Sequence, residues 1–209
     1  MPTLVGKRAP DFSAKAVVNG KIVENFTISQ FQGKKYVILF FYPKDFTFVC
    51  PTEIVAFQNA LKDFDDRNVQ VIGCSTDSEY SHLAWINTPR AQGGIAGITF
   101  PIVSDINKTI SASYGVLAGE TSMDADGNPK AKGELVAYRG LFLIDKEGII
   151  QHEVVNNFPL GRSTEEELRM VDALQHFEQF GEVCPMNWHK GEKAMKPDAK
   201  STGEYLASK

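Results

Sequence analysis

Apolar side chains run without interruption from Tyr36 to Tyr42, a stretch that reads Tyr-Val-Ile-Leu-Phe-Phe-Tyr. A continuous run of β-branched and aromatic residues of this length predicts a strand buried on both faces, as in the middle of a parallel or mixed sheet. From 51 to 67 the apolar residues recur at helical spacing instead, and Asn68 is suited to end that helix in a left-handed conformation. The pattern thus predicts a buried strand followed by a helix.

Strand and helix patterns continue to alternate along the chain. Further strands are predicted at 69–73 and 99–103, and further helices at 80–88 and 106–114. Pro101 indicates that the second of these strands lies at an edge of the sheet or ends there. Pro89 and Gly115 follow the two helices and are expected to end them.

The last third of the chain adds a hairpin and a long helix. Residues 140–155 have the pattern of a β-hairpin with a polar turn at 145–148. Ser163 and Glu166 have the spacing of a capping box, which opens a helix that Gly181 ends. Strands and helices in this order predict an α/β fold in which helices cover both faces of a central mixed sheet.

Beyond Gly181 the composition changes. Lysines, glycines and prolines interrupt every apolar pattern, which predicts an extended arm and not a packed element. Cys184 and Trp188 stand at the root of this arm, and the tryptophan is expected to be buried.

The overall composition is that of an ordinary globular protein. Of 209 residues, 43% are hydrophobic and 23% are charged, and the formal net charge is −4 at pH 7. A chain of this size can bury a sufficient core without disulfide or metal staples, as one domain with an extension or as two small domains. Mild acidity weighs against a nucleic-acid binder, which usually carries a basic field.

Neither a targeting segment nor a membrane span is expected. The N-terminal sequence is interrupted by Pro2, Lys7 and Arg8 and lacks the apolar core of a signal peptide. The longest apolar run, at 36–42, is far shorter than the ~20 residues that cross a bilayer. We therefore expect a soluble protein of the cytoplasm with no membrane partner.

The three cysteines, Cys50, Cys74 and Cys184, are too few and odd in number for the disulfide framework of a small secreted protein. The sequence contains no Cys-x-x-Cys, and its four histidines form no metal-ligand spacing with the cysteines. Cysteine chemistry is therefore expected to come from isolated thiols without a metal. Cys74 ends a predicted strand and is expected to be buried and structural.

Cys50 is the strongest candidate for a reactive thiol, because it lies where the buried strand passes into the helix. Pro51 suits the first position of a helix, so Cys50 is expected at the N-cap or in the first turn. Backbone N–H groups and the helix dipole favour the nucleophilic thiolate there, whereas the alternative is a buried, inert cysteine. Thr47 adds a hydroxyl that can orient two linked oxygen atoms, or can serve as a helix cap.

Longer motifs surround these residues. They are Pro10-Asp11-Phe12, Phe40-Phe41-Tyr42-Pro43, Thr47-Phe48-Val49-Cys50-Pro51-Thr52-Glu53, residues 82–90 (His-Leu-Ala-Trp-Ile-Asn-Thr-Pro-Arg), residues 139–145 (Arg-Gly-Leu-Phe-Leu-Ile-Asp), Gly161-Arg162-Ser163 and Gly181-Glu182-Val183-Cys184-Pro185. With them, nearly the whole chain resembles the typical 2-Cys peroxiredoxins of the alkyl hydroperoxide reductase C type. Gly93-Gly94-Ile95-Ala96 and Tyr205-Leu206 depart from the pattern of members that are easily overoxidised.

The resemblance implies a three-layer thioredoxin-like fold and a thiol-dependent peroxidase. The peroxidase domain is expected over residues 1–160, and a C-terminal helix and arm over 161–209. The implied substrates are hydrogen peroxide and organic hydroperoxides, and the implied reductant is thioredoxin or a flavoprotein disulfide reductase. Sulfenic acid chemistry of this kind calls for no metal or organic cofactor on the chain itself.

The resemblance also assigns roles to residues. Cys50 matches the peroxidatic cysteine, which attacks a peroxide and becomes a sulfenic acid. Cys184 matches the resolving cysteine, which attacks that sulfenic acid from the partner subunit. Pro43, Thr47 and Arg139 match the rest of the active-site motif.

The side chains of Arg139 and Pro43 suit these roles, and each also has a structural alternative. Arg139 can place a permanent cation beside Cys50, although an arginine at a strand start often forms a surface salt bridge. Pro43 can shield the thiolate from water, although it can also simply end the preceding strand. Residues expected to support the pocket are Glu53, Trp85 and Arg162.

A homodimer is expected, because residues 149–155 end a sheet after the hairpin and leave an edge that can pair with its copy in a second chain. The resemblance implies that five such dimers close into a ring through the loops around Phe46 and Ser81.

Two other functions stay open. One is a thiol–disulfide oxidoreductase of the same fold, which the absence of Cys-x-x-Cys argues against. The other is a chaperone-like assembly whose cysteines are incidental.

Overall fold

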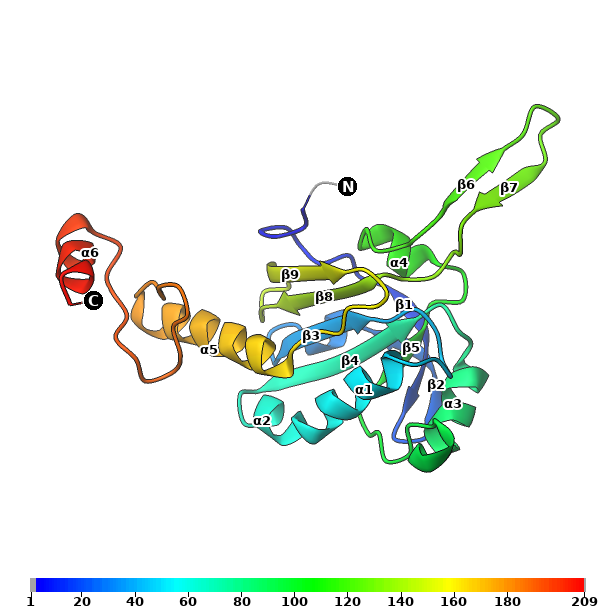
Figure 1. Ribbon diagram of the computed structural model, residues 1–209, viewed down its shortest axis with the longest axis horizontal. Coiled ribbons are helices and arrows are strands. Elements are labelled where there is room, and N and C mark those ends of the chain that lie inside the picture. Colours follow the sequence, from blue (N-terminus) through cyan, green and yellow to red (C-terminus); the bar gives the residue numbers. More distant parts are fainter. Residues whose placement is uncertain (1–2, 209) are drawn as a thin grey trace. The chain divides into compact units, whose positions relative to one another are not determined.

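Within residues 3–162, seven strands form a mixed sheet (Figure 1). The structure is a computed structural model that describes residues 3–208. In sheet order the strands are β2 (Lys21–Thr27), β1 (Ser13–Val18), β5 (Ile102–Ser104), β4 (Val69–Ser75), β3 (Tyr36–Phe41), β8 (Arg139–Ile144) and β9 (Ile150–Asn156). β4 is parallel to both β3 and β5, and the remaining pairs are antiparallel, which confirms the predicted mixed sheet.

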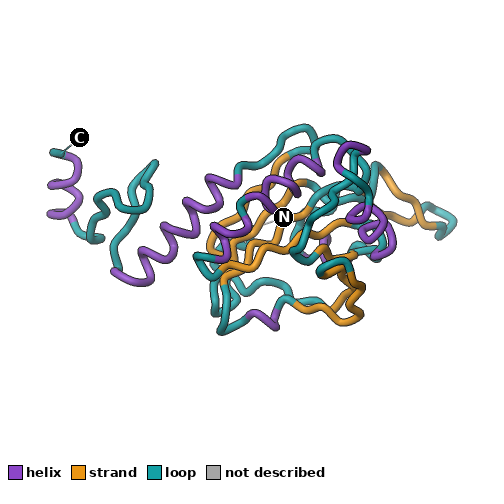
Figure 2. Tube along the Cα trace, turned by 90° about the horizontal axis from the view of Figure 1, so that it is seen from below, coloured by secondary structure: helices purple, strands orange, loops and turns teal. Residues whose placement is uncertain are grey.

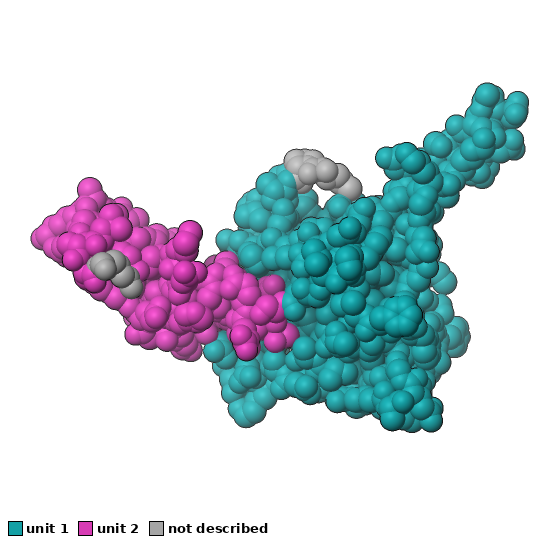
Figure 3. All heavy atoms as spheres, viewed as in Figure 1, with its two compact units in different colours: residues 1–162 teal, residues 163–209 magenta. Residues whose placement is uncertain are grey.

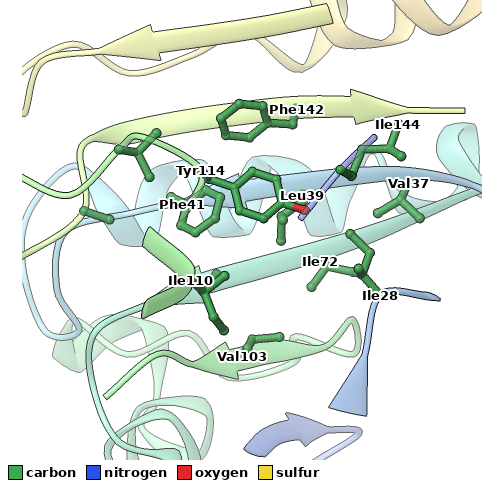
Figure 4. Close-up of a cluster of buried hydrophobic side chains, with 14 of the residues drawn as sticks. Ile28, Val37, Leu39, Phe41, Ile72, Val103, Ile110, Tyr114, Phe142 and Ile144 are labelled. Atoms are coloured by element: carbon green, nitrogen blue, oxygen red, sulfur yellow. The ribbon is translucent and has the colours of Figure 1, made fainter. Parts of the chain in front are cut away.

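β3 is buried along its whole length, as its apolar run predicts. Val37, Leu39 and Phe41 belong to a hydrophobic cluster on one face of the sheet (Figure 4). Phe40 points to the opposite face, where its ring stacks on Phe57 with 4.4 Å between centroids. Because both faces are covered, the strand needs no polar alternation.

Helices cover both faces of this sheet (Figure 2). On the Phe40 face lie α1 (Cys50–Asn59), α2 (Leu61–Asp65) and α3 (Glu79–Asn87), and on the other lies α4 (Thr109–Ser113). Short 3-10 helices occupy Ser29–Phe31 and Arg90–Gln92. The predicted α/β layer architecture is therefore confirmed.

The single helix predicted over 51–67 is wrong in one respect, because the structure interrupts it at Ala60. Ala60 has φ −89° and ψ 4°, outside the helical range, so α1 ends before it and α2 begins after it. Residues 52–67 contain neither glycine nor proline, so the periodicity carries no signal for this break. Asn68 has φ 57° and adopts the predicted left-handed conformation.

Two element boundaries in the middle of the chain also differ from the prediction. β5 begins directly after Pro101, so this proline stands at an end of the strand, which was one of the two predicted alternatives. The other alternative is wrong, because β5 lies between β1 and β4 and not at an edge of the sheet. α4 begins at Thr109, three residues later than predicted. The two carboxylate oxygens of Asp105 accept the N–H groups of Ile110 and Ser111, which sets the start of this helix.

In the described chain, two hairpins have no counterpart among the predicted elements. One is β1–β2, and the other joins β6 (Glu120–Met123) to β7 (Pro129–Lys132). Every residue of β6 and β7 is exposed, and this hairpin extends away from the sheet (Figure 1). Neither face of such a ribbon is buried, so its sequence carries no apolar alternation to reveal it.

The chain divides into two compact units, residues 1–162 and 163–209 (Figure 3). The second unit contains α5 (Thr164–Phe180). As predicted, the Ser163 hydroxyl accepts the Glu166 N–H at its start, and Gly181, with φ 66°, ends it.

The extended arm predicted after Gly181 is wrong in one respect, because this part of the chain contains a helix, whereas Trp188 at its root is buried, as predicted. α6 (Ala199–Leu206) is capped by Asp198, whose carboxylate accepts the Ser201 N–H. Trp188 is 1% exposed, and its ring centroid lies 4.9 Å from that of His176 on α5. Trp188 thus packs the root of the arm against α5 within the same compact unit.

Candidate active site

Cys50 is the first residue of α1 and is 1% exposed. Val49 is the N-cap, and Pro51 occupies the second helical position, one residue later than predicted. Cys50 therefore lies in the first turn, where unpaired backbone N–H groups favour an anion.

Arg139, at the start of β8, brings a buried guanidinium to this sulfur. Its Nη1 lies 3.5 Å from Cys50 Sγ and donates to Glu53 Oε2 at 2.7 Å, while its Nε donates to the Phe158 carbonyl at 2.7 Å. Arg139 is 3% exposed, so the alternative of a surface salt bridge is wrong. The three contacts fix the plane of the guanidinium beside the sulfur.

Glu53 joins a second arginine to this group. Arg162 donates from Nε to Oε1 at 2.8 Å and from Nη2 to Oε2 at 2.9 Å, and its backbone N–H donates to Oε1 at 3.0 Å. Glu53 and both arginine side chains are almost completely buried. Two guanidinium groups and one carboxylate leave a formal charge of +1, which a thiolate at Cys50 would neutralise.

A cavity of about 490 Å³ opens in front of Cys50. Its walls are mainly apolar and include Pro43, Phe48, Val49, Val136, Phe158 and Pro159. Thr47 also lines it, and the Thr47 hydroxyl donates to the Lys44 carbonyl at 2.9 Å instead of capping α1. Its oxygen lone pairs therefore remain able to accept a hydrogen bond from a ligand.

None of the three predicted supporting residues lines this cavity: Glu53 and Arg162 act through Arg139, whereas Trp85 contacts a neighbouring loop. Trp85 is fully buried on α3, and its indole N–H donates to the Gly93 carbonyl at 2.8 Å. Its ring lies 5.7 Å from that of Phe46, between centroids. Trp85 thus supports the loop that carries Thr47, at a distance from the sulfur.

A buried polar network fixes the same loop and was not predicted. The Asp45 carboxylate accepts the hydroxyls of Tyr42 and Ser81, each at 2.8 Å, and lies 2.9 Å from His82 Nδ1. The other His82 nitrogen faces the Val103 carbonyl at 3.2 Å. Burial, reinforced by the Asp45 charge, raises the pKa of Tyr42, which keeps its hydroxyl a donor. No spacing rule links residues 37 positions apart, so the sequence gives no signal for this network.

Cys184 belongs to the second compact unit, whereas Cys50 and the residues that line its cavity belong to the first. Its thiol lies 3.7 Å from the Ala173 carbonyl, and burial raises its pKa, although nearby Arg169 acts in the opposite direction. Cys74 is fully buried in the core, where burial raises its pKa well above the ordinary value, as expected of a structural cysteine. All three cysteines are free thiols.

Comparison with known proteins identifies the group to which this site belongs. Residues 5–153, which include Cys50 and Arg139, match the AhpC/TSA family. The chain belongs to this family. Residues 173–208 of the chain, which include Cys184, match the C-terminal domain of 1-Cys peroxiredoxin.

Relatives match the peroxiredoxin over nearly its full length. It is 52% identical to alkyl hydroperoxide reductase C of Helicobacter pylori, over 97% of this chain and 96% of the relative. It is 49% identical to the chloroplastic 2-Cys peroxiredoxin BAS1 of Hordeum vulgare, over 98% and 91%. The solved structure of reduced Plasmodium vivax 2-Cys peroxiredoxin superimposes with a TM-score of 0.88, at 49% identity, over 99% of this chain and 100% of that one.

These matches confirm the predicted family, the thioredoxin-like fold and the activity. The protein is a typical 2-Cys peroxiredoxin, an enzyme that reduces peroxides with cysteine thiols and is returned to the reduced state by a thiol reductant. Among residues 3–208, no helix has both the length and the apolar character needed to span a bilayer. In the same residues, no three His, Cys, Asp or Glu side chains are grouped to hold a metal ion.

Proposed function

We propose that Cys50 is the peroxidatic cysteine of this thiol peroxidase. The observation that carries the proposal is the distance of 3.5 Å between Cys50 Sγ and Nη1 of buried Arg139, at the end of an open cavity. A permanent positive charge at this distance stabilises the thiolate and the negative charge that develops on the peroxide oxygens.

In the first step the Cys50 thiolate attacks one oxygen of a hydroperoxide, ROOH. A sulfur–oxygen bond forms and the oxygen–oxygen bond breaks, so the sulfur becomes a sulfenic acid while the peroxide is reduced. The leaving alkoxide or hydroxide takes a proton from solvent and departs as alcohol or water. Hydrogen peroxide and organic hydroperoxides both suit this step, because the cavity walls are mainly apolar.

The surrounding residues orient the two reacting oxygens. Thr47 accepts the hydrogen bond of the peroxide O–H, and Arg139 donates to the oxygen that leaves. Pro43, which is buried in the wall, keeps water from the thiolate. Glu53 holds Arg139 in place and is itself held by Arg162.

Cys184 is proposed as the resolving cysteine, supplied by the partner subunit. Its sulfur attacks the sulfur of the Cys50 sulfenic acid, a disulfide forms, and the hydroxyl leaves as water. The raised pKa of Cys184 keeps it a protonated thiol before this step. Thioredoxin or a flavoprotein disulfide reductase then reduces the disulfide, and the chain itself needs no cofactor.

The proposed homodimer forms through β9, the last strand of the sheet. The N-terminal segment pairs with the start of this strand, since the Gly6 N–H donates to the Ile150 carbonyl and the Ile150 N–H donates to the Lys7 carbonyl. The edge from there to Asn156 is proposed to pair antiparallel with its copy.

A ring of five dimers is proposed to close through the loops around Phe46 and Ser81. Phe46 is 52% exposed and Tyr80, beside Ser81, is 67% exposed. Phe46 stands on a loop, whereas Tyr80 and Ser81 belong to the first turn of α3, and exposed large side chains such as Phe46 and Tyr80 are typical of a contact surface between subunits.

The cytoplasm is the proposed location. Relatives of the chain are named for other compartments, as the chloroplastic Hordeum vulgare protein and the mitochondrial Plasmodium falciparum protein are.

Arg139→Ala is expected to lower the second-order rate constant of Cys50 with hydrogen peroxide by roughly 10²-fold, because it removes a buried donor that meets developing charge. Arg139→Lys should also be slower than wild type, since an ammonium cannot contact the sulfur, Glu53 and the Phe158 carbonyl together. Rapid mixing of reduced protein with peroxide measures the constant. Arg90→Lys, outside the cavity, is the control and should react normally. Equal constants for wild type and Arg139→Ala would refute the role.

The resolving role of Cys184 is tested by the covalent species that peroxide produces. One equivalent of hydrogen peroxide should convert wild type into a disulfide-linked dimer on a non-reducing gel, while Cys184→Ser should stay monomeric on the gel. Cys74→Ala is the control and should form the dimer. A dimer that persists in Cys184→Ser and disappears in Cys74→Ala would overturn both assignments. Peroxide consumption with thioredoxin and its reductase distinguishes this cycle from a non-enzymatic scaffold.

A further inference from the structure

Two opposite charges stand among the residues that line the Cys50 cavity. Lys44 Nζ and Glu134 Oε2 form an ion pair at 2.8 Å, and both residues line the cavity. Their side chains are 43% and 69% exposed, so the pair lies at the solvent-facing rim. Arg139, in contrast, is buried beside the sulfur. A substrate tail that leaves the cavity on this side passes the pair.

Glu134 is held at the rim by the root of the β6–β7 hairpin. The root is closed by hydrogen bonds from the Ala118 N–H to the Val136 carbonyl at 2.8 Å and from the Tyr138 N–H to the Val116 carbonyl at 2.7 Å. The segment that returns from β7 therefore carries Glu134 at the rim, Val136 in the wall and then Arg139 beside Cys50.

Close packing at this root leaves little freedom to displace Glu134. Gly119 has φ 83°, and a Cβ there would lie 2.9 Å from the Lys132 carbonyl and 3.0 Å from the Glu134 carbonyl. Only glycine fits this approach of the two arms of the hairpin. The backbone that bears Glu134 is thus fixed by contacts within the hairpin and not by the ion pair alone.

The cavity combines apolar walls with an ion pair at its exit. An apolar chain attached to the hydroperoxide group can lie along the walls. If that chain carries a carboxylate, Lys44 attracts it, while Glu134 repels it and competes for Lys44. An uncharged chain meets neither effect.

We infer that the Lys44–Glu134 pair balances the charge at this side of the cavity: Lys44 favours and Glu134 disfavours an organic hydroperoxide that carries a carboxylate, so the intact pair gives neither the charged nor the uncharged substrate an advantage. The inference rests on the proposed function of Cys50 as the reacting thiolate. Hydrogen peroxide is small and neutral, so its reaction is independent of the pair.

The test compares the hydroperoxide of an unsaturated fatty acid with its methyl ester, which differ in charge and are nearly equal in size. Single-turnover rate constants are measured below the concentration at which either lipid forms micelles. Glu134→Gln should raise the acid-to-ester ratio of rate constants by about fivefold, and Lys44→Gln should lower it by a similar factor, as for one unit charge near contact in water. The change in this ratio should become smaller at high ionic strength in both variants, because salt screens the charges.

Glu120→Gln is the matched control, because it removes the same charge from the same hairpin at an exposed position outside the cavity lining. It should leave the ratio at the wild-type value, and all three variants should react with hydrogen peroxide at the wild-type rate. A ratio unchanged in both Glu134→Gln and Lys44→Gln, with normal hydrogen peroxide rates, would overturn the role of the ion pair alone. Failure of wild-type Cys50 to react with hydrogen peroxide would instead contradict the proposed function.

Discussion

Cys50→Ser is expected to lower peroxide turnover by on the order of 10⁴-fold or more while the chain still folds. The change removes the nucleophile, and residual binding by the cavity cannot form the sulfenic acid. Serine is nearly isosteric with cysteine, and Arg139, Glu53 and Arg162 retain their mutual contacts. The measurement is steady-state peroxide consumption with thioredoxin and its reductase.

Cys74→Ala is the matched control for removal of a thiol. It empties a small volume in the core and should cost stability, yet turnover of the folded fraction should stay near the wild-type value. Substantial turnover by folded Cys50→Ser would show that another group attacks the peroxide.

The second large effect is expected on stability. Glu53→Gln should lower the free energy of unfolding by about 3–5 kcal/mol, because it leaves two buried guanidinium groups without their carboxylate. Glu53, Arg139 and Arg162 have side chains that are 2–4% exposed, so solvent cannot replace the lost charge. Denaturant unfolding of the reduced protein at a fixed concentration measures the change.

Asp66→Asn is the control for this substitution. It removes a carboxylate from the Lys62–Asp66 ion pair, whose side chains are 82% and 58% exposed. Exposed pairs of this kind contribute little, so the unfolding midpoint should stay close to that of wild type. Equal stability of Glu53→Gln and wild type would mean that the two arginines do not depend on Glu53.

Elements could be predicted from the sequence where buried side chains form a continuous or regularly spaced apolar pattern, or where cap residues mark the ends. β3 has no polar residue and lies inside the sheet, and α5 has both of its predicted ends, at Ser163 and Gly181. The β6–β7 ribbon and α6 could not be predicted in the same way. Exposed strands carry no apolar alternation, and α6 has no buried residue to set a period.

The candidate site likewise contains one feature that local sequence predicts and one contact that it does not. The position of Cys50 in the first turn of a helix followed from local sequence, since Pro51 and the preceding strand mark the junction. Its contact with Arg139 joins residues 89 positions apart and came only from resemblance to a family. Local patterns contain no information about such a contact.

The same limit applies to the unpredicted polar groups. The Asp45–His82 pair and the Lys44–Glu134 pair each bring together elements that only the folded sheet places side by side. A single charged or polar residue in the sequence does not indicate its partner, because a solvated side chain produces the same pattern.

The most direct test of the central claim identifies the first atom that peroxide oxidises. Reduced Cys184→Ser, in which the cycle stops after the first step, is treated with one equivalent of hydrogen peroxide in the presence of a reagent that traps sulfenic acids, and peptides are analysed by mass spectrometry. The account predicts one adduct per chain, on Cys50. An adduct on Cys74, or unmodified Cys50 after the peroxide has been consumed, would contradict it.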